Sequence, residues 1–236
     1  FSKPFQVFYA PSIFWWALGV CVVIVISPYF TLKSNDVLKS INYPLFLVLI
    51  YATMFIHELG HIGACAKYGI KHGGIGFGFY FIMPVMYADI SNIWLADKKR
   101  RIIANMAGIF NEILYAAILA IIYLINKDLT VLAAAMFIST FVLWEFNPFV
   151  RFDGYWILSD LTSTPNLLQK GNSALKNALS SQNLKKPIAS IKKTSPSVFF
   201  LFMYGLFNTL FWVAFMSYTL YSSWETVVHF PMIVWQ

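Results

Sequence analysis

Long apolar segments constrain this sequence more than any other feature. Apolar residues make up 59% of the 236 residues and charged residues only 11%, fewer charges than a soluble domain carries. A helix needs about 20 residues to cross a hydrocarbon core. Runs this long predict helices, because a chain in lipid must satisfy its backbone hydrogen bonds internally. Five segments meet this requirement: 13–30, 44–66, 102–125, 131–150 and 198–221.

The sequence therefore predicts an all-α polytopic membrane protein, built as a single membrane-embedded domain over residues 1–236, with the lipid bilayer as a partner. No small-x-small cleavage site follows the first segment, so we expect it to stay in the chain rather than act as a cleaved signal peptide. The two cysteines, Cys21 and Cys65, lie within apolar runs and are expected to be buried thiols without a redox role.

The 17 Lys and Arg residues predict the orientation in the membrane. With the N-terminus in the cytoplasm, all of them except Lys33, Lys39 and Lys127 fall on the cytoplasmic side. Basic residues gather on that side, so we expect a multi-pass protein of the cytoplasmic membrane with a cytoplasmic N-terminus. The basic residues between the apolar segments account for the net charge of +7, and no motif indicates a nucleic-acid partner.

Two of the connections between apolar segments have structure of their own. Residues 70–93 are apolar but rich in glycine, which does not favour a continuous helix. The alternation over Ile75–Phe81 predicts a β-strand, with Val85–Ile90 as its partner in a small hairpin. The polar, Lys-rich residues 157–197 are expected to form a cytoplasmic loop with one short helix near Leu167–Leu179.

The second apolar segment contains the sequence His57-Glu58-Leu59-Gly60-His61. Residues four apart share one face of a helix, so both imidazoles can bind one metal ion while Glu58 reaches a water molecule on that metal. The alternative is a pair of histidines that hydrogen-bond within a helical bundle. Ionisable side chains within membrane spans are costly and usually functional, which favours the metal site.

A catalytic zinc ion usually has three protein ligands and one open position, so a third ligand must come from elsewhere in the chain. Asp153 follows the fourth apolar segment, at the cytoplasmic end where His57 and His61 are also predicted. The pair Asn147-Pro148 interrupts the helix, as expected where backbone lines a polar cavity. The alternative for Asp153-Gly154 is a plain helix-ending turn. We expect one Zn²⁺ per chain.

The motifs HELGH and NPFVRFDGYW together resemble those of the site-2 protease family of intramembrane zinc metalloproteases. The stretch Asn147–Leu167 looks most like the branch linked to bacterial peptide maturation and export. The resemblance implies that His57, His61 and Asp153 bind zinc and that Glu58 is the catalytic base. It also implies a membrane-inserted protein or peptide as substrate, and partners in peptide maturation or export.

The chain departs from the family pattern in two places. The helix after the hairpin region carries Gly108-Ile109-Phe110-Asn111 without the proline that family members often show, and Glu145 stands where many have an asparagine. Asn147 is the candidate for the family's asparagine near the substrate or oxyanion. Glu112 and Glu145 are candidates for accepting the second N–H of a zinc-bound histidine, with a polar helix–helix contact as the alternative.

These inferences predict an intramembrane zinc metalloendopeptidase that hydrolyses peptide bonds within or next to a membrane-inserted segment. The alternative is a non-proteolytic zinc-binding scaffold or a subunit of a peptide export complex. A transporter is disfavoured, because the five segments show no inverted repeat. Two roles stay open for the hairpin: an edge that pairs with an unwound substrate, or a seal over the cytoplasmic mouth of the site.

Overall fold

The computed structural model describes residues 5–27, 41–80, 83–180 and 196–234. They belong to two compact units, Phe1–Ser163 and Thr164–Gln236. Helices dominate both units, and the described residues contain one two-stranded antiparallel sheet. This confirms the predicted class, an all-α membrane protein with a small hairpin. The single-domain organisation stays a prediction.

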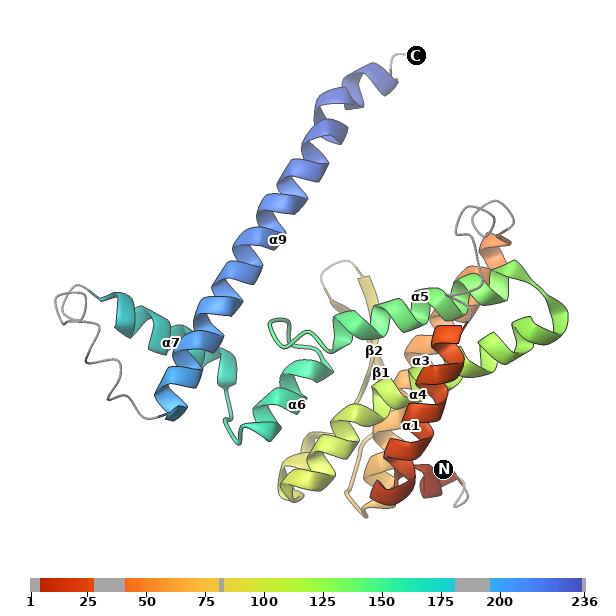
Figure 1. Ribbon diagram of the computed structural model, residues 1–236, viewed down its shortest axis with the longest axis horizontal. Coiled ribbons are helices and arrows are strands. Elements are labelled where there is room, and N and C mark those ends of the chain that lie inside the picture. Colours follow the sequence, from red (N-terminus) through yellow and green to blue (C-terminus); the bar gives the residue numbers. More distant parts are fainter. Residues whose placement is uncertain (1–4, 28–40, 81–82, 181–195, 235–236) are drawn as a thin grey trace. The chain divides into compact units, whose positions relative to one another are not determined.

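Helix α4 (Lys98–Asn126) is the centre of the first unit (Figure 1). The other elements of this unit are η1 (Phe5–Tyr9), α1 (Pro11–Ile26), α3 (Tyr43–Lys67), β1 (Ile75–Tyr80), β2 (Met83–Ala88), η4 (Ser91–Leu95), α5 (Leu129–Glu145) and α6 (Asp153–Leu161). Helix α4 packs against α1, α3, α5 and α6. Its middle is buried almost without interruption, so the side chains that it carries inward meet those of α3, α5 and α6.

Among the described residues, three helices are long and apolar enough to cross a membrane: α3, α4 and the Ser197–Trp224 part of α9 (Pro196–Val234). Helices α1 and α5 are apolar but shorter, with 16 and 17 residues. They correspond to the predicted segments 13–30 and 131–150, although residues 28–30 lie outside the described part. The membrane class is therefore supported, while the count of five crossings and the orientation stay predictions.

Local sequence signals start the two helices at the centre of the unit. The Asn42 side chain caps α3 by accepting a hydrogen bond from the Leu45 N–H at 3.2 Å, and Pro44 lies in the first turn. The Asp97 side chain caps α4 in the same way, with the Arg100 N–H at 3.1 Å. Helix α3 then continues without a break through its histidine motif.

Helices α3 and α4 approach each other closely where α3 carries Gly60. A Cβ at Gly60 would overlap the main-chain carbonyl of Ala107, so only glycine allows this approach. Asn111 of α4 strengthens the contact: it donates to the Ile56 carbonyl at 3.0 Å and accepts from the Tyr9 hydroxyl at 2.9 Å. These contacts fix the position of α3, and with it the histidine motif, against α4.

The glycine-rich connection forms the predicted hairpin. Strand β1 pairs antiparallel with β2, and Gly76 lies opposite Tyr87, whose ring covers it. At the base of the hairpin the Asp89 N–H donates to the Gly74 carbonyl. Successive residues of a strand direct their N–H groups to opposite edges, so the Ala88 N–H points away from β1. The last residue of the predicted first strand, Phe81, lies outside the described residues.

Helix α5 ends at Glu145, before the predicted end of the span at Val150. The Asn147 side chain accepts a hydrogen bond from the Phe149 N–H at 2.9 Å, which makes a turn that replaces the helix. Helix α6 begins at Asp153, and a Cβ at Gly154 would overlap the Phe146 carbonyl. The Asp-Gly pair therefore opens a helix packed against the end of α5, and the alternative of a helix-ending turn is wrong.

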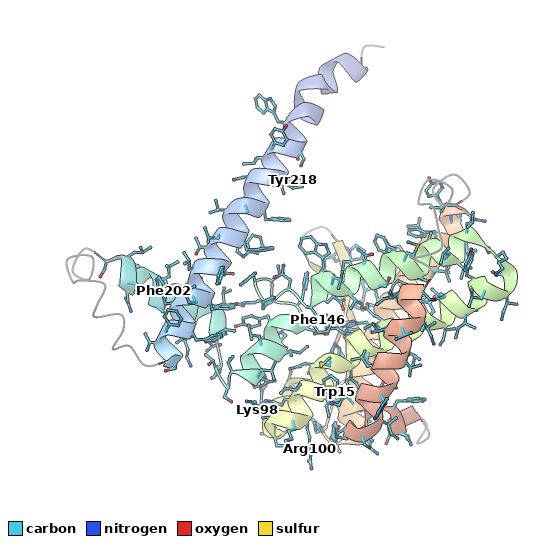
Figure 2. All side chains as sticks on the ribbon, viewed as in Figure 1. Trp15, Lys98, Arg100, Phe146, Phe202 and Tyr218 are labelled. Carbon is cyan, nitrogen blue, oxygen red and sulfur yellow. The ribbon has the colours of Figure 1, made fainter. Side chains whose placement is uncertain are left out.

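The second unit consists of α7 (Leu167–Leu179), the short helix predicted in the polar connection, and α9. The two helices meet at Gly171 and Gly205, where a Cβ on Gly205 would overlap the Gly171 carbonyl. Many side chains of α9 between Val198 and Trp224 are exposed, and Tyr218 is 70% exposed, as expected of a helix in contact with lipid (Figure 2). Residues 181–195 of the predicted loop lie outside the described part.

Candidate metal centre

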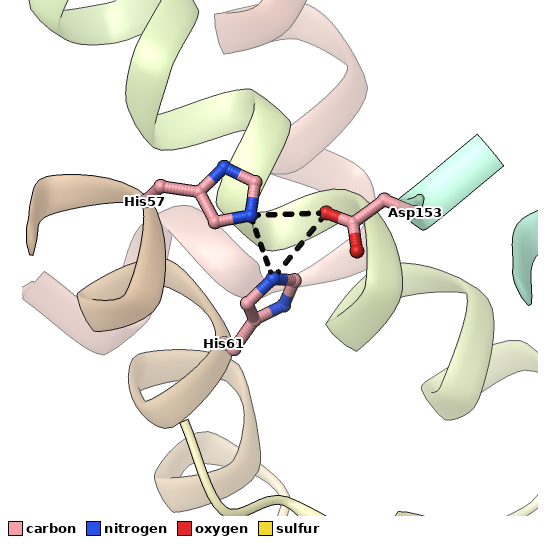
Figure 3. Close-up of side chains that lie close together, drawn as sticks. All are labelled: His57, His61 and Asp153. Atoms are coloured by element: carbon pink, nitrogen blue, oxygen red, sulfur yellow. Dashed lines mark hydrogen bonds and ion pairs between the residues drawn. The ribbon is translucent and has the colours of Figure 1, made fainter. Parts of the chain in front are cut away.

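The structure brings together the three side chains predicted as metal ligands (Figure 3). His57 Nε2 lies 3.0 Å from His61 Nε2, and Asp153 Oδ2 lies 3.2 Å and 3.3 Å from these two nitrogens. Ligand atoms of a tetrahedral zinc ion, each about 2.0–2.2 Å from the metal, lie about 3.3 Å from one another. The spacing of the three donor atoms therefore fits one zinc ion.

The protonation of Asp153 also fits a ligand. Burial raises the pKa of its carboxyl group, but the electrostatic interaction with His61 and the contacts with both imidazoles outweigh burial and hold that pKa below its ordinary value in the metal-free protein. The carboxylate is thus ionised at neutral pH, as metal binding requires. Its Oδ2 atom is buried and makes no hydrogen bond of good geometry with any described residue, which leaves it available to a cation.

The outer nitrogens of the two imidazoles have different partners. His61 Nδ1 lies 2.8 Å from the Ala104 carbonyl, a contact that places the proton on Nδ1 and leaves Nε2 as a metal donor. His57 Nδ1 lies 3.4 Å from Glu112 Oε1 and 3.6 Å from Glu145 Oε1. Both glutamates are buried, so the two candidates from the sequence converge on the same histidine.

Gly108 of α4 lies directly beside the two histidine nitrogens that are candidate metal ligands. A Cβ at this position would lie 2.5 Å from His57 Nε2 and 2.7 Å from His61 Nε2. No side chain larger than hydrogen fits there, so α4 presents bare backbone to the centre. The sequence marks Gly108 only as part of a family-type motif, and its contact with both histidines becomes visible in the structure.

Glu58 lies beside this cluster and is held from the hairpin side. Its Oε2 atom accepts a hydrogen bond of 2.7 Å from the Ala88 N–H of β2. Glu58 interacts electrostatically with His61, His57 and Asp153, so it is close to the centre without belonging to the ligand group. This arrangement suits a group that exchanges protons with a molecule held at the metal.

Asn147 is placed differently from the other predicted site residues. Its side-chain oxygen is engaged in the turn after α5, where it accepts from the Phe149 N–H. The described contacts of Asn147 do not connect it to the ligand group, so its predicted role near the substrate stays a prediction. Asn111, which the sequence marks only as a motif residue, instead takes a structural part by holding α3 to α4.

The fold and the site define a helical membrane protein with a His–His–Asp candidate metal centre. The chain is similar to a protein of Bacillus subtilis (strain 168) named "Putative peptide zinc metalloprotease protein YydH". The two are 28% identical over 158 residues, which are 63% of this chain and 62% of that protein. The similarity supports a relationship to zinc metalloproteases.

The chain thus spans about three fifths of the length of this curated relative. No protein-family profile matches the sequence. No solved structure is significantly similar to it.

Proposed function

We propose that this protein is an intramembrane zinc metalloprotease of the site-2 type. The observation that carries the proposal is the cluster of His57, His61 and Asp153, with donor atoms no more than 3.3 Å apart and Glu58 beside them. The named relative, a zinc metalloprotease by its description, supports the same chemistry. The position of the two histidines within α3, a helix long enough to span a membrane, supports action within the bilayer.

Each of these residues has a defined part in peptide hydrolysis. A zinc ion bound by His57, His61 and Asp153 supplies Lewis acidity toward a water molecule and a peptide carbonyl. Glu58 accepts the proton of the attacking water and donates it to the nitrogen of the leaving amine. The Ala104 carbonyl keeps the His61 ring in the tautomer that binds metal. Asn147 is proposed as a hydrogen-bond donor to the substrate oxyanion.

The substrate proposed is a protein or peptide segment inserted in the membrane, which must unwind before its carbonyl groups become accessible. An unwound chain can pair with the exposed edge of a sheet. Among the described residues β1 pairs only with β2, and its Phe77 and Phe79 side chains are 62% and 72% exposed. We therefore propose the outer edge of β1 as the place where substrate adds as a strand.

The remaining parts of the proposal concern the cell. The distribution of basic residues supports a multi-pass protein of the cytoplasmic membrane with the centre toward the cytoplasmic side. The printed name of the relative supports a peptide as substrate, and a peptide maturation or export system as partner is proposed from the family resemblance.

The first experiment measures zinc per chain by elemental analysis in purified wild type and Asp153→Ala. We expect about one zinc ion per wild-type chain and strong loss in the variant, because one of three protein ligands is removed. The second measures cleavage of synthetic transmembrane and leader-like peptides in detergent micelles by mass spectrometry, with Glu58→Gln as the matched control. If wild type and Glu58→Gln both bind zinc and the wild type cleaves none of the peptides, the non-proteolytic scaffold is favoured.

A further inference from the structure

The contact between Glu58 and the hairpin is a charge-assisted hydrogen bond between a helix side chain and a strand main chain. The Glu58 Oε2 atom lies 2.7 Å from the Ala88 nitrogen, a length typical of the stronger bonds formed by carboxylates. Among the described residues, only one oxygen of this carboxylate accepts a hydrogen bond. The other oxygen is left for proton exchange, so the bond orients the group without consuming it.

The direction of the Ala88 N–H follows from the register of the sheet. Asp89 donates to Gly74 and therefore points its N–H at β1, so the preceding residue, Ala88, points its N–H away from β1. Pro84 and Met86 are four and two residues before Ala88 in β2, so their main-chain nitrogens lie on the same edge of the strand as that of Ala88. Pro84 has no N–H to donate, as is usual on the unpaired edge of a strand. The edge of β2 that faces Glu58 thus offers few donors.

The base of the hairpin fixes the position of this donor. The Gly73 N–H donates to the Asp89 carbonyl at 2.7 Å, and the Asp89 N–H donates to the Gly74 carbonyl at 3.1 Å. The Asp89 side chain accepts from the Ser91 hydroxyl at 2.7 Å, and the Asn92 side chain donates to the Lys71 carbonyl at 2.9 Å. Four hydrogen bonds within a few residues of Ala88 therefore hold its amide in place.

We propose that the Ala88 main-chain N–H is the positioning group for the Glu58 carboxylate, and that it couples the placement of the catalytic base to the pairing of the hairpin. The proposal rests on the proposed function where it treats Glu58 as a base, but the hydrogen bond itself does not depend on that function. Any displacement of the base of the hairpin moves the donor and releases Glu58. The competing interpretation is that Glu58 only satisfies a main-chain N–H with no effect on the chemistry.

The first test measures hydrogen exchange of individual amides in wild type, Glu58→Ala and Glu58→Gln, each purified in detergent micelles without added peptide. Glutamine keeps an oxygen acceptor and alanine does not. We expect exchange of the Ala88 amide to rise about tenfold or more in Glu58→Ala and to stay near the wild-type rate in Glu58→Gln. The Tyr87 amide, which faces β1, is followed in the same experiment as the measure of strand pairing.

Equal exchange of the Ala88 amide in wild type and Glu58→Ala would overturn the proposal. An equal rise in Glu58→Ala and Glu58→Gln would also overturn it, because an acceptor is present in the second variant. If the Tyr87 amide exchanges faster in Glu58→Ala but not in Glu58→Gln, the bond also stabilises the hairpin, and the coupling is supported.

The second test removes the donor rather than the acceptor. Ala88→Pro deletes the N–H that reaches Glu58, and Met86→Pro deletes an N–H on the same edge two residues away. Both changes spare the bonds to β1, and Pro84 shows that this edge accepts proline. With the metal ligands unchanged, we expect both variants to keep wild-type zinc content. Ala88→Pro should lower kcat/KM for a cleaved peptide about tenfold or more, and Met86→Pro should stay near wild type.

Equal activity of Ala88→Pro and Met86→Pro, whether both high or both low, would overturn a specific role for the Ala88 donor. If the wild type cleaves none of the peptides, the proposed protease function fails. The exchange experiment needs no cleavage, so in that case it still shows whether Glu58 holds the Ala88 amide. The failure of one proposal is therefore distinguishable from the failure of the other.

Discussion

Asp160 of α6 accepts a 2.7 Å hydrogen bond from the Arg101 guanidinium of α4. Its second oxygen accepts from the Asn105 side chain at 3.0 Å, so a buried carboxylate has both oxygens satisfied by one neighbouring helix. Asp160 lies about two helical turns beyond Asp153, the first residue of α6. The three-residue network thus holds the helix whose first residue is the third candidate metal ligand.

The first prediction concerns this network. Asp160→Asn removes a buried charge partner of Arg101, which costs about 1–3 kcal/mol and loosens α6 on α4. We expect a lower melting temperature, followed by intrinsic tryptophan fluorescence in micelles, and a weaker zinc affinity in chelator competition. The matched control is Asp97→Asn, which keeps the cap of α4 and removes only an exposed pair with Arg100. An effect of Asp97→Asn as large as that of Asp160→Asn would contradict the prediction.

The second prediction concerns the bare backbone beside the histidines. In Gly108→Ala the new Cβ would lie 2.5 Å from His57 Nε2, so the ring must move away from the metal position. Alanine itself favours a helix by about 0.5–1 kcal/mol over glycine, so α4 should not be weakened. We expect zinc content to fall well below one ion per chain by elemental analysis, while the helical circular dichroism is retained.

Gly19→Ala in α1 is the control for that substitution. A Cβ at Gly19 meets nothing within 4 Å, so this variant makes the same chemical change in open space. We expect full zinc content and unchanged or slightly higher stability. Full zinc content in Gly108→Ala as well would show that the histidine rings tolerate a methyl group there, contrary to the prediction.

The cluster of candidate ligands could be predicted from sequence because its members are side chains in a recognisable pattern. The helical spacing places His57 and His61 on one face, and the Asn147-Pro148 interruption indicates where the fourth apolar segment stops being a helix. The structure adds that α5 ends at Glu145 and that a new helix begins at Asp153. The hairpin was predictable for the same reason, since its glycine and aromatic residues alternate.

The supporting contacts could not be predicted in this way. The Ala104 carbonyl and the Ala88 N–H are main-chain groups, which every residue carries and no motif marks. The pairing of Arg101 with Asp160 joins residues 59 positions apart, and only the packing of α6 on α4 brings them together. The number of membrane crossings stays a prediction, since α1 and α5 are shorter than a typical span.

The third prediction separates the two roles of the hairpin. Because Asp89 pairs with Gly74 and Tyr87 with Gly76, the N–H of Phe77 points to the outer edge of β1. Phe77→Pro removes that donor and spares the bonds to β2. If substrate adds as a strand at this edge, cleavage of a transmembrane peptide should fall about tenfold, as measured by mass spectrometry.

Phe77→Ala is the control for the aromatic ring, because it keeps the N–H and deletes the 62% exposed side chain. We expect Phe77→Ala to cleave at a rate close to that of the wild type. Wild-type cleavage by Phe77→Pro would instead favour the hairpin as a seal over the mouth of the centre.

The last prediction concerns the two carboxylates beside His57. Glu112 and Glu145 come from different helices, and their Oε1 atoms lie 3.4 Å and 3.6 Å from His57 Nδ1. When Nε2 binds metal, Nδ1 carries one proton, and one carboxylate is enough to accept its hydrogen bond. If one glutamate is removed, the other can therefore take over this role. We expect the double variant Glu112→Leu/Glu145→Leu to lose about 10–100-fold in zinc affinity, and each single variant to lose less.

The same double variant should not lose stability. Both carboxylates are buried, and within the described part of the chain each has an oxygen without a hydrogen bond, so leucine removes a desolvation penalty as well as a group that orients His57. Chelator competition measures the zinc affinity, and thermal unfolding of the metal-free proteins measures the stability. A lower melting temperature with unchanged zinc affinity would assign the pair to helix packing, because the contacts of Glu112 and Glu145 with His57 would then serve to hold α4 and α5 against α3.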